Sequence, residues 1–170
     1  MRIAGSGRDV AMMGLRREWV PLLTTLGASL LQALPVVVTT PVVPDFAFLV
    51  LLAWRLLRPE MWQAYVALPL GLFNDLVAGH PLGQSMALWT ATFLVCDLLD
   101  SRSGWRDYWL DWLFASLVIA LYTAAEWRIA GWMGSHIQFQ VILPQLVLGI
   151  FFYPVVARLV VSLDRWRLAR

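Results

Sequence analysis

The feature that most constrains this chain is a series of long apolar stretches separated by short junctions that carry arginine. A helix that crosses the hydrocarbon core of a bilayer needs roughly 20 predominantly apolar residues. Apolar side chains make up 60% of the 170 residues, charged ones only 14%, and the mean hydropathy is +0.69. Such a composition is far from that of a soluble domain, so we expect an integral membrane protein.

Six apolar segments can be delimited, and we expect an all-α fold in which they form one compact bundle of six transmembrane helices. The whole chain, residues 1–170, would then be a single transmembrane domain. The second segment is the weakest, because a helix of its length covers only ~22 Å of a hydrocarbon core of ~30 Å. The predicted spans are residues 19–40, 43–57, 61–79, 82–100, 108–130 and 137–161, with tails of residues 1–18 and 162–170.

The arginines predict the orientation, because positively charged flanks stay on the cytoplasmic side during insertion. With the N-terminus inside, all of the 13 basic residues except Arg128 fall on the cytoplasmic side. This split favours an even number of spans with both tails in the cytoplasm. Arg16 and Arg17 precede the first apolar stretch as in a secretory signal, but that stretch exceeds a typical signal core, so we expect an uncleaved span.

Prolines and charges predict where the helices begin and end. Pro44 followed by Asp45 suits a helix start, since proline fixes φ and a carboxylate is stabilised near the positive end of the helix dipole. Arg55 and Arg58 suit the end of that helix, and the Pro-Glu pair that follows suits the start of the next. Trp54, like most tryptophans of the chain, lies near a predicted helix end, where indole rings favour the headgroup level.

The stretch GLFNDLVAGHPLGQS is the most informative part of the sequence, because it puts Asn74 and Asp75 inside an otherwise apolar helix. On insertion scales a carboxylate costs ~2.5–3.5 kcal/mol at the centre of a membrane helix, so it should face protein, water or a partner. Spacing by four places Asp75 on one helix face with Ala67, Gly71 and Gly79. Small residues let helix backbones approach closely, so this face is a predicted packing surface with one polar anchor.

Two interpretations of this surface stand side by side. In the first, Asn74 and Asp75 fix a helix of a partner protein or a polar ligand; in the second, they hydrogen-bond a neighbouring helix of the same bundle. A Pro-Leu-Gly turn with Pro81 and Gly83 follows directly. We expect it to form a tight outer connection that also shapes the site. The candidate partner-binding residues are Ala67, Gly71, Asn74, Asp75, Gly79, Pro81 and Gly83.

Other polar residues give weaker signals. Four carboxylates near the predicted inner loop alternate with Arg102 and Arg106; they are Asp97, Asp100, Asp107 and Asp111. Such a cluster can bind a divalent cation. The stronger interpretation is that these carboxylates lie at a helix N-terminus and are neutralised by arginine, and docking of a cytoplasmic partner is a further hypothesis.

Both histidines are predicted to lie exposed in outer loops, at His80 and His136. A shallow outward-facing cavity would have as its lining Asn74, Asp75, Glu126, Gln138 and Gln145.

Nothing in the sequence indicates catalysis. The chain contains no HExxH, GxSxG, Walker-type or CxxC pattern, and its single cysteine, Cys96, excludes an internal disulfide. The arginines are dispersed rather than gathered on one basic face, which argues against nucleic-acid binding. We therefore expect a protein that is not an enzyme and has no catalytic residues, cofactor or metal ion.

The segment GLFNDLVAGHPLGQSMALW resembles the MreD family of bacterial rod-shape-determining inner-membrane proteins. The family core is a Gly-Leu-x-x-Asp-Leu stretch, a short spacer with glycine, and then Pro-Leu-Gly-x-x-Ala-Leu. The rest of the chain is similar in length and in the Pro-Asp start of the second helix. The residues that occupy the pattern are Gly71, Leu72, Asp75, Leu76, Gly79, Pro81, Leu82, Gly83, Ala87 and Leu88.

The resemblance implies a non-enzymatic membrane scaffold of the cell-elongation machinery. It would bind the membrane helix of MreC and work with MreB, RodA and a penicillin-binding transpeptidase in lateral peptidoglycan synthesis and rod shape. The family is also similar in architecture to the substrate-binding membrane subunits of energy-coupling-factor transporters. The competing hypothesis is therefore a vitamin-type small-molecule binding subunit of a transporter, and an intramembrane enzyme comes third.

Overall fold

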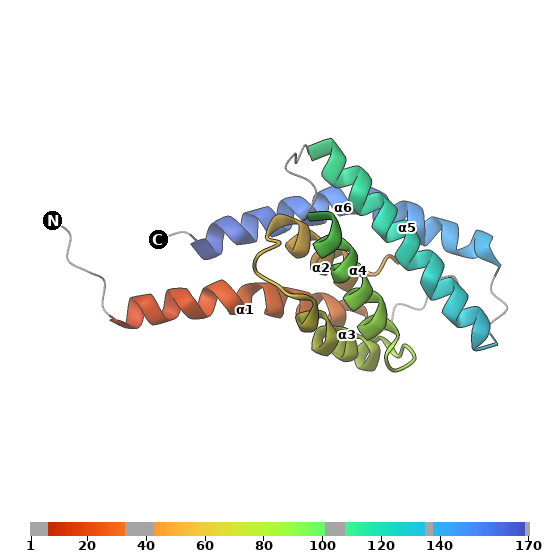
Figure 1. Ribbon diagram of the computed structural model, residues 1–170, viewed down its shortest axis with the longest axis horizontal. Coiled ribbons are helices and arrows are strands. Elements are labelled where there is room, and N and C mark those ends of the chain that lie inside the picture. The colour runs from red at the N-terminus through yellow and green to blue at the C-terminus, as the bar shows by residue number, and fades with distance from the viewer. Residues whose placement is uncertain (1–6, 33–42, 101–107, 135–137, 169–170) are drawn as a thin grey trace.

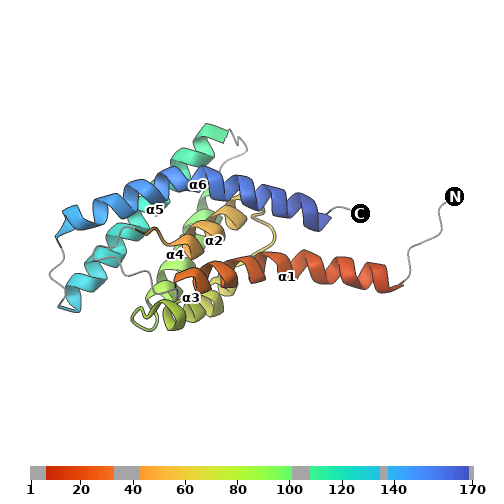
Figure 2. The same ribbon diagram turned by 180° about the vertical axis from the view of Figure 1, so that it is seen from behind.

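The computed structural model describes residues 7–32, 43–100, 108–134 and 138–168. These residues form helices and no strand, which confirms the all-α prediction. Helix α2 lies centrally, α3 and α4 form an antiparallel hairpin, and α5 crosses α6 (Figure 1 and, from behind, Figure 2). The helices are α1 (Gly7–Gln32), α2 (Phe46–Leu57), α3 (Ala64–Ala78), α4 (Gln84–Asp100), α5 (Tyr108–Trp132) and α6 (Phe139–Leu168).

Two helices, α5 and α6, are long and apolar enough to cross a membrane. Only 28% of the most apolar window of α5 and 22% of that of α6 are buried inside the molecule, whereas the core helix of a soluble protein would be mostly buried. Their apolar side chains thus face outward and need a non-aqueous surrounding. Helices α2, α3 and α4 are apolar but shorter, with 12, 15 and 17 residues. A count of six crossings stays a prediction.

The short helix α2 is the centre of the core. Most of its side chains are buried, and Phe48 stacks on Tyr122 of α5 with ring centroids 3.8 Å apart. The predicted start at Pro44 and Asp45 is confirmed, because the Asp45 carboxylate caps the helix by accepting the Phe48 N–H at 2.9 Å. Arg58 is the C-terminal cap. Because α2 is surrounded by protein, its own length need not match the bilayer.

The predicted opening of the third helix at Pro59 and Glu60 is wrong. These residues lie in a turn, and α3 begins only at Ala64 after Gln63 as its N-terminal cap. The reason lies in Trp62, which is only 5% exposed and stacks on Phe93 of α4. The chain turns before α3 so that this large ring enters the core.

Helices α1 and α6 extend beyond the apolar segments that predicted them. Helix α1 already begins at Gly7, within the predicted tail, and α6 continues to Leu168 because its last turns bury Asp164 and Arg167 against other helices. The predicted end of the first span lies outside the described residues. The start of α1 and the end of α6 lie at one end of the molecule, called the terminal end; the α3–α4 turn lies at the hairpin end (Figures 1 and 2).

Candidate functional site

The α3–α4 hairpin is built by the sequence stretch that carries the family resemblance. Gly79 ends α3 in the left-handed region with φ 71°, and Gly83 has φ 94° just before α4. Residues with a Cβ rarely adopt such angles, so glycine is required at both positions. The Gln84 N–H donates to the Pro81 carbonyl at 3.0 Å, which closes the turn. The predicted tight connection is thus present.

Asp75 joins the two helices of the hairpin. Its Oδ2 accepts the Gly83 N–H and its Oδ1 accepts the Ser85 N–H, both at 2.8 Å. These donors lie at the N-terminus of α4, where backbone N–H groups lack helical partners and the helix dipole favours a negative charge. The buried carboxylate therefore has a local structural role: it anchors the start of α4 to the end of α3.

Gly71 sets the distance between the same two helices. A Cβ at this position would lie 2.6 Å from both the Cα and the N of Met86, which are backbone atoms of α4. No side chain fits without separating the helices. Ala67, on the same face, is fully buried. Asn74 completes the contact, since its Nδ2 donates to Ser85 Oγ at 3.1 Å.

The hairpin thus follows the second of the two interpretations, hydrogen bonding within the bundle, for Ala67, Gly71, Asn74 and Asp75. Direct contact between these buried side chains and a partner is untested. The other half of the pattern is accessible: Leu76 is 65% exposed and Leu82 is 72% exposed. Ala87 begins an exposed strip along α4, named here the α4 face, which consists of Ala87, Ala91, Leu94, Val95 and Leu98.

A cavity of about 570 Å³ opens at the hairpin end, where it is lined by the end of α1, the segment before α2, the end of α3, the hairpin turn, and α4, α5 and α6. Glu126 and Gln145, two of the residues predicted to line an outer cavity, do line it, whereas Asn74 and Asp75 are turned into the hairpin and Gln138 is exposed elsewhere. His80, predicted to be exposed, is half-buried and also lines the cavity. His136 lies outside the described residues. The polar lining is Gln32, Asp45, His80, Gln84, Thr123, Glu126 and Gln145.

Asp45 is the polar centre of this cavity, a role that the sequence did not reveal beyond helix capping. Its Oδ2 accepts the Tyr122 hydroxyl at 2.8 Å, and its Oδ1 accepts Gln32 Nε2 in addition to the Phe48 N–H. Glu126 lies four positions after Tyr122 on α5 and lines the same cavity. The hydrogen bonds of Asp45 therefore join α1, the start of α2 and α5.

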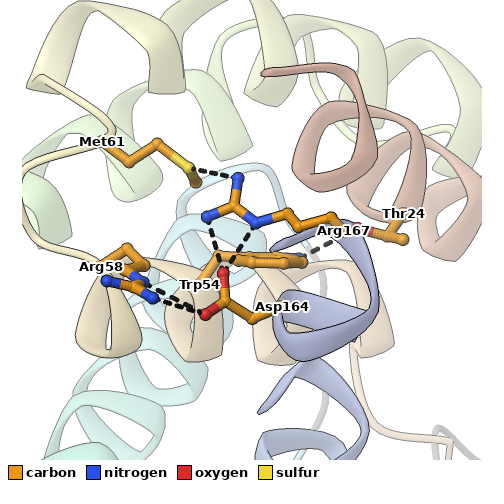
Figure 3. A network of polar contacts seen from close by, with 6 residues as sticks. All are labelled: Thr24, Trp54, Arg58, Met61, Asp164 and Arg167. Carbon is orange, nitrogen blue, oxygen red and sulfur yellow. Dashed lines mark hydrogen bonds and ion pairs between the residues drawn. The ribbon is translucent and has the colours of Figure 1, made fainter. Parts of the chain in front are cut away.

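At the terminal end, Asp164 of α6 holds two arginines together (Figure 3). Arg58 donates from Nε and Nη2 to Asp164 Oδ2 at 3.2 and 2.8 Å, and Arg167 donates from Nε and Nη2 to Oδ1, each at 2.7 Å. The hydrogen bonds that Arg58 donates to Asp164 raise the pKa of its guanidinium above its usual value. Three charges thus tie the connection after α2 to the end of α6.

The carboxylate cluster predicted near the inner loop divides in the structure. Asp97 forms an ion pair with Arg55, whose side chain is only 2% exposed although its position suggested a helix flank in the headgroups. Asp111 lies in the first turn of α5, as expected for a helix N-terminus. The side chains of Asp100 and Asp107 and the loop arginines lie outside the described residues. Among described side chains, none are grouped to hold a metal ion.

The family model of the rod shape-determining protein MreD matches residues 16–163, which is most of the chain. The chain belongs to the MreD family. The family resemblance inferred from the hairpin motif is thereby confirmed, and with it membership of a membrane protein family that acts in rod shape determination. No curated protein and no solved structure matches the chain, so an architecture like that of energy-coupling-factor subunits stays a prediction.

For this MreD-family chain, the sequence missed two sets of functional candidates. Asp45 and Gln32 entered no predicted site because Asp45 meets its partners Gln32 and Tyr122 only through the fold, Tyr122 being 77 positions away. Arg58 and Asp164 are separated by 106 positions, and no local spacing indicates their pairing. A charged residue in the middle of an apolar helix was the one available signal, and it pointed to Asp75.

Proposed function

We propose that this MreD-family chain is a non-enzymatic scaffold of the cell-elongation machinery that binds the single membrane helix of MreC. In this role it would support lateral peptidoglycan synthesis together with MreB, RodA and a penicillin-binding transpeptidase. The family match supports a role in rod shape. The observation that carries the MreC proposal is the α4 face, which begins at Ala87 within the family pattern and points away from α3.

The chemistry of the α4 face suits a helix from another chain. Its residues Ala87, Ala91, Leu94 and Leu98 follow the spacing of one helical stripe, with alanines at the hairpin end and leucines toward the other end. Leu94 is 56% exposed and Leu98 is 59% exposed. Small residues allow close backbone approach, and leucines fill the gaps of a facing helix, which are the requirements for lateral association in a bilayer.

Co-purification tests this surface. Ala91→Leu should lower recovery of MreC roughly ten-fold, equivalent to about 1.4 kcal/mol of binding free energy, because it fills the shallow half of the α4 face. The matched control is Gly27→Leu on α1, because a Cβ at Gly27 would have no atom beyond its own stretch of helix within 4 Å. Unchanged MreC recovery with Ala91→Leu would remove the α4 face from the interface.

Substitutions at Asp75 and Gly71 test a different point. Both residues are buried between α3 and α4, so Asp75→Leu or Gly71→Leu would alter MreC recovery by disturbing the hairpin that presents the α4 face. Each variant must first be shown to insert. Full MreC recovery from an inserted Asp75→Leu protein would show that the interface does not depend on the hairpin.

The scaffold would lie in the bacterial inner membrane with six crossings and both tails in the cytoplasm. The position of the start of α1 and the end of α6 at one end of the molecule supports this orientation (Figure 1). In this orientation the terminal end is the inner end and the cavity at the hairpin end opens outward. Cysteine labelling from either side tests it; termini on opposite sides would contradict it.

The cavity at the hairpin end favours one alternative function, a vitamin-type small-molecule binding subunit of a transporter. Its volume of about 570 Å³ is in the range of ligand pockets, and Asp45, Glu126 and Gln145 provide polar groups among apolar walls. Radiolabelled uptake, or a thermal shift with vitamins, separates the two functions. Depletion of the protein should round the cells if it is a scaffold and create a nutrient requirement if it is an importer.

A further inference from the structure

A second cavity, of about 760 Å³, lies at the terminal end beside the Asp164 network. It is bounded by α1, the end of α2, the connection to α3, the start of α3 and the end of α6. Under the proposed orientation this is the level of the cytoplasmic headgroups. The cavity is separate from both the hairpin and the outer cavity.

Two arginines, Arg58 and Arg167, line this cavity. Figure 3 shows that both of them contact Asp164. One carboxylate accepts from both guanidiniums, so the three side chains carry a net charge of about +1. Each arginine uses its Nε and Nη2 edge for Asp164, which leaves the Nη1 end of Arg58 outside the pair. Arg58 is 47% exposed, so an approaching anion can reach it.

The second arginine is fixed in position before any ligand arrives. Arg167 is 3% exposed, and its Cζ lies 5.1 Å from the ring centroid of Trp54. Trp54 is in turn fixed by a hydrogen bond of 3.0 Å from its Nε1 to Thr24 Oγ1, and Arg167 Nη1 reaches the Met61 Sδ at 3.2 Å. A thioether sulfur is a weak acceptor. A guanidinium that is held in place loses little conformational freedom when it binds an anion.

Apolar side chains form the smaller part of the surface that lines this cavity, beside the larger polar part. Leu22 of α1, Leu57 of α2 and Val66 of α3 surround the arginines. A free inorganic anion would gain nothing from such walls, whereas the glycerol and upper acyl carbons of a lipid would bury apolar surface there. The one acidic lining residue, Glu60, is exposed at the rim, where water and salt screen its charge.

We propose that this inner cavity binds the phosphate of an anionic phospholipid, with Arg58 donating to the phosphate, Arg167 adding a fixed positive charge, and the apolar lining residues contacting the glycerol and acyl carbons. The proposal rests on the proposed membrane orientation. The Nη1 end of Arg58 can donate a charge-assisted hydrogen bond to phosphate while its Nε and Nη2 stay on Asp164, and basic pockets between helices on the cytoplasmic side are suited to anionic headgroups. Lipid bound there would stabilise the junction of α1, α3 and α6.

The test compares lipid binding by the full chain, purified without MreC and delipidated, using native mass spectrometry. Phosphatidylglycerol should be retained about five-fold better than phosphatidylcholine, which is the contribution expected of one basic residue near an anionic surface. Arg58→Gln should abolish this preference. Glu60→Gln should increase retention of phosphatidylglycerol. Arg128→Gln, at the hairpin end, should leave retention unchanged and is the matched control.

Two results would overturn the proposal: equal retention of the two lipids by the wild-type chain, or an unchanged preference in Arg58→Gln. Inorganic phosphate added in excess is the probe for a free anion. If it displaces phosphatidylglycerol, the site recognises a soluble phosphate and the lipid assignment fails. MreC is absent from all of these measurements, so their outcome does not depend on the α4 face. A negative result would therefore contradict lipid binding at the inner cavity without affecting the proposal that the α4 face binds MreC.

Discussion

Two buried carboxylates, Asp75 and Asp164, are stabilised in contrasting ways in the two halves of the molecule. Asp75 is 1% exposed and accepts two backbone N–H groups that lie eight and ten positions further along the chain. Asp164 accepts from two arginines, one of which is 106 positions away. The hairpin is therefore stabilised by local contacts of backbone groups and glycines. The terminal end depends instead on charged side chains that only the complete fold brings together.

This difference implies that the geometry of the hairpin is fixed, whereas the arginines of the terminal end can change partners. Backbone donors at a helix N-terminus have one geometry, so the hairpin holds the α4 face in a set position. Arginine side chains can exchange a carboxylate for a phosphate. We therefore expect changes in the hairpin to disturb folding and partner binding together, and changes at the terminal end to depend on the lipid that surrounds the protein.

The largest effect is expected at Gly71. Gly71→Leu should destabilise the chain by more than about 3 kcal/mol, because its side chain would enter backbone atoms of α4. Thermal melting followed by size-exclusion chromatography measures the loss. Gly27→Leu should leave the melting temperature nearly unchanged, since space is open there. Similar melting of the Gly71 and Gly27 variants would contradict the close packing of α3 and α4.

Asp75→Leu should rank second, with a loss of about 2–4 kcal/mol, because two N–H groups of the α4 start lose their acceptor. Asp75→Asn keeps one carbonyl oxygen and should recover about half of that loss. The same melting assay compares the two. If the amide proves as harmful as leucine, charge rather than hydrogen bonding would be the main contribution of Asp75.

Asp164→Asn should destabilise by about 2–3 kcal/mol, because the buried Arg167 loses its counter-charge. Asp164→Asn should be nearly as unstable as Asp164→Leu, whereas Asp75→Asn should be clearly more stable than Asp75→Leu. Glu60→Gln is the control, an exposed carboxylate whose loss should change stability by less than about 0.5 kcal/mol. Full stability of Asp164→Asn would mean that the terminal end does not depend on its ion pairs.

Tyr122→Phe should have the smallest effect, about 1 kcal/mol, since it removes one hydrogen bond of 2.8 Å to Asp45 and leaves the stack on Phe48 intact. The same melting assay measures this loss. The Tyr122→Leu variant removes the ring as well and should be clearly less stable. An equal loss in the two variants would place all of the contribution in the hydroxyl group.

The sequence predicted the local features of the molecule and missed those that depend on distant partners. The all-α class, the capping role of Asp45 and the importance of Asp75 followed from hydropathy, helix-start signals and one charge in an apolar run. Of the residues predicted to line an outer cavity, Glu126 and Gln145 do line the cavity at the hairpin end, because they share one end of the bundle.

Trp54 and Arg55 show why the rest was not predictable. Their position after an apolar run is typical of a headgroup boundary, yet both are buried because α2 is enclosed by other helices. A linear pattern reports the polarity of a segment and not its depth in a bundle. For the same reason, the hydropathy of the last segment ended the predicted helix before Asp164, whereas ion pairing and burial carry α6 on to Leu168.

The most direct test of the scaffold role is site-specific photo-crosslinking in cells that also contain MreC. A photoreactive residue placed at Ala91 or Leu98 on the α4 face should form an adduct with MreC. The same residue at Leu117 or Leu121, which are 57% and 61% exposed on α5, should form none. Adducts from α5 alone would contradict the proposal that the hairpin presents α4 to its partner.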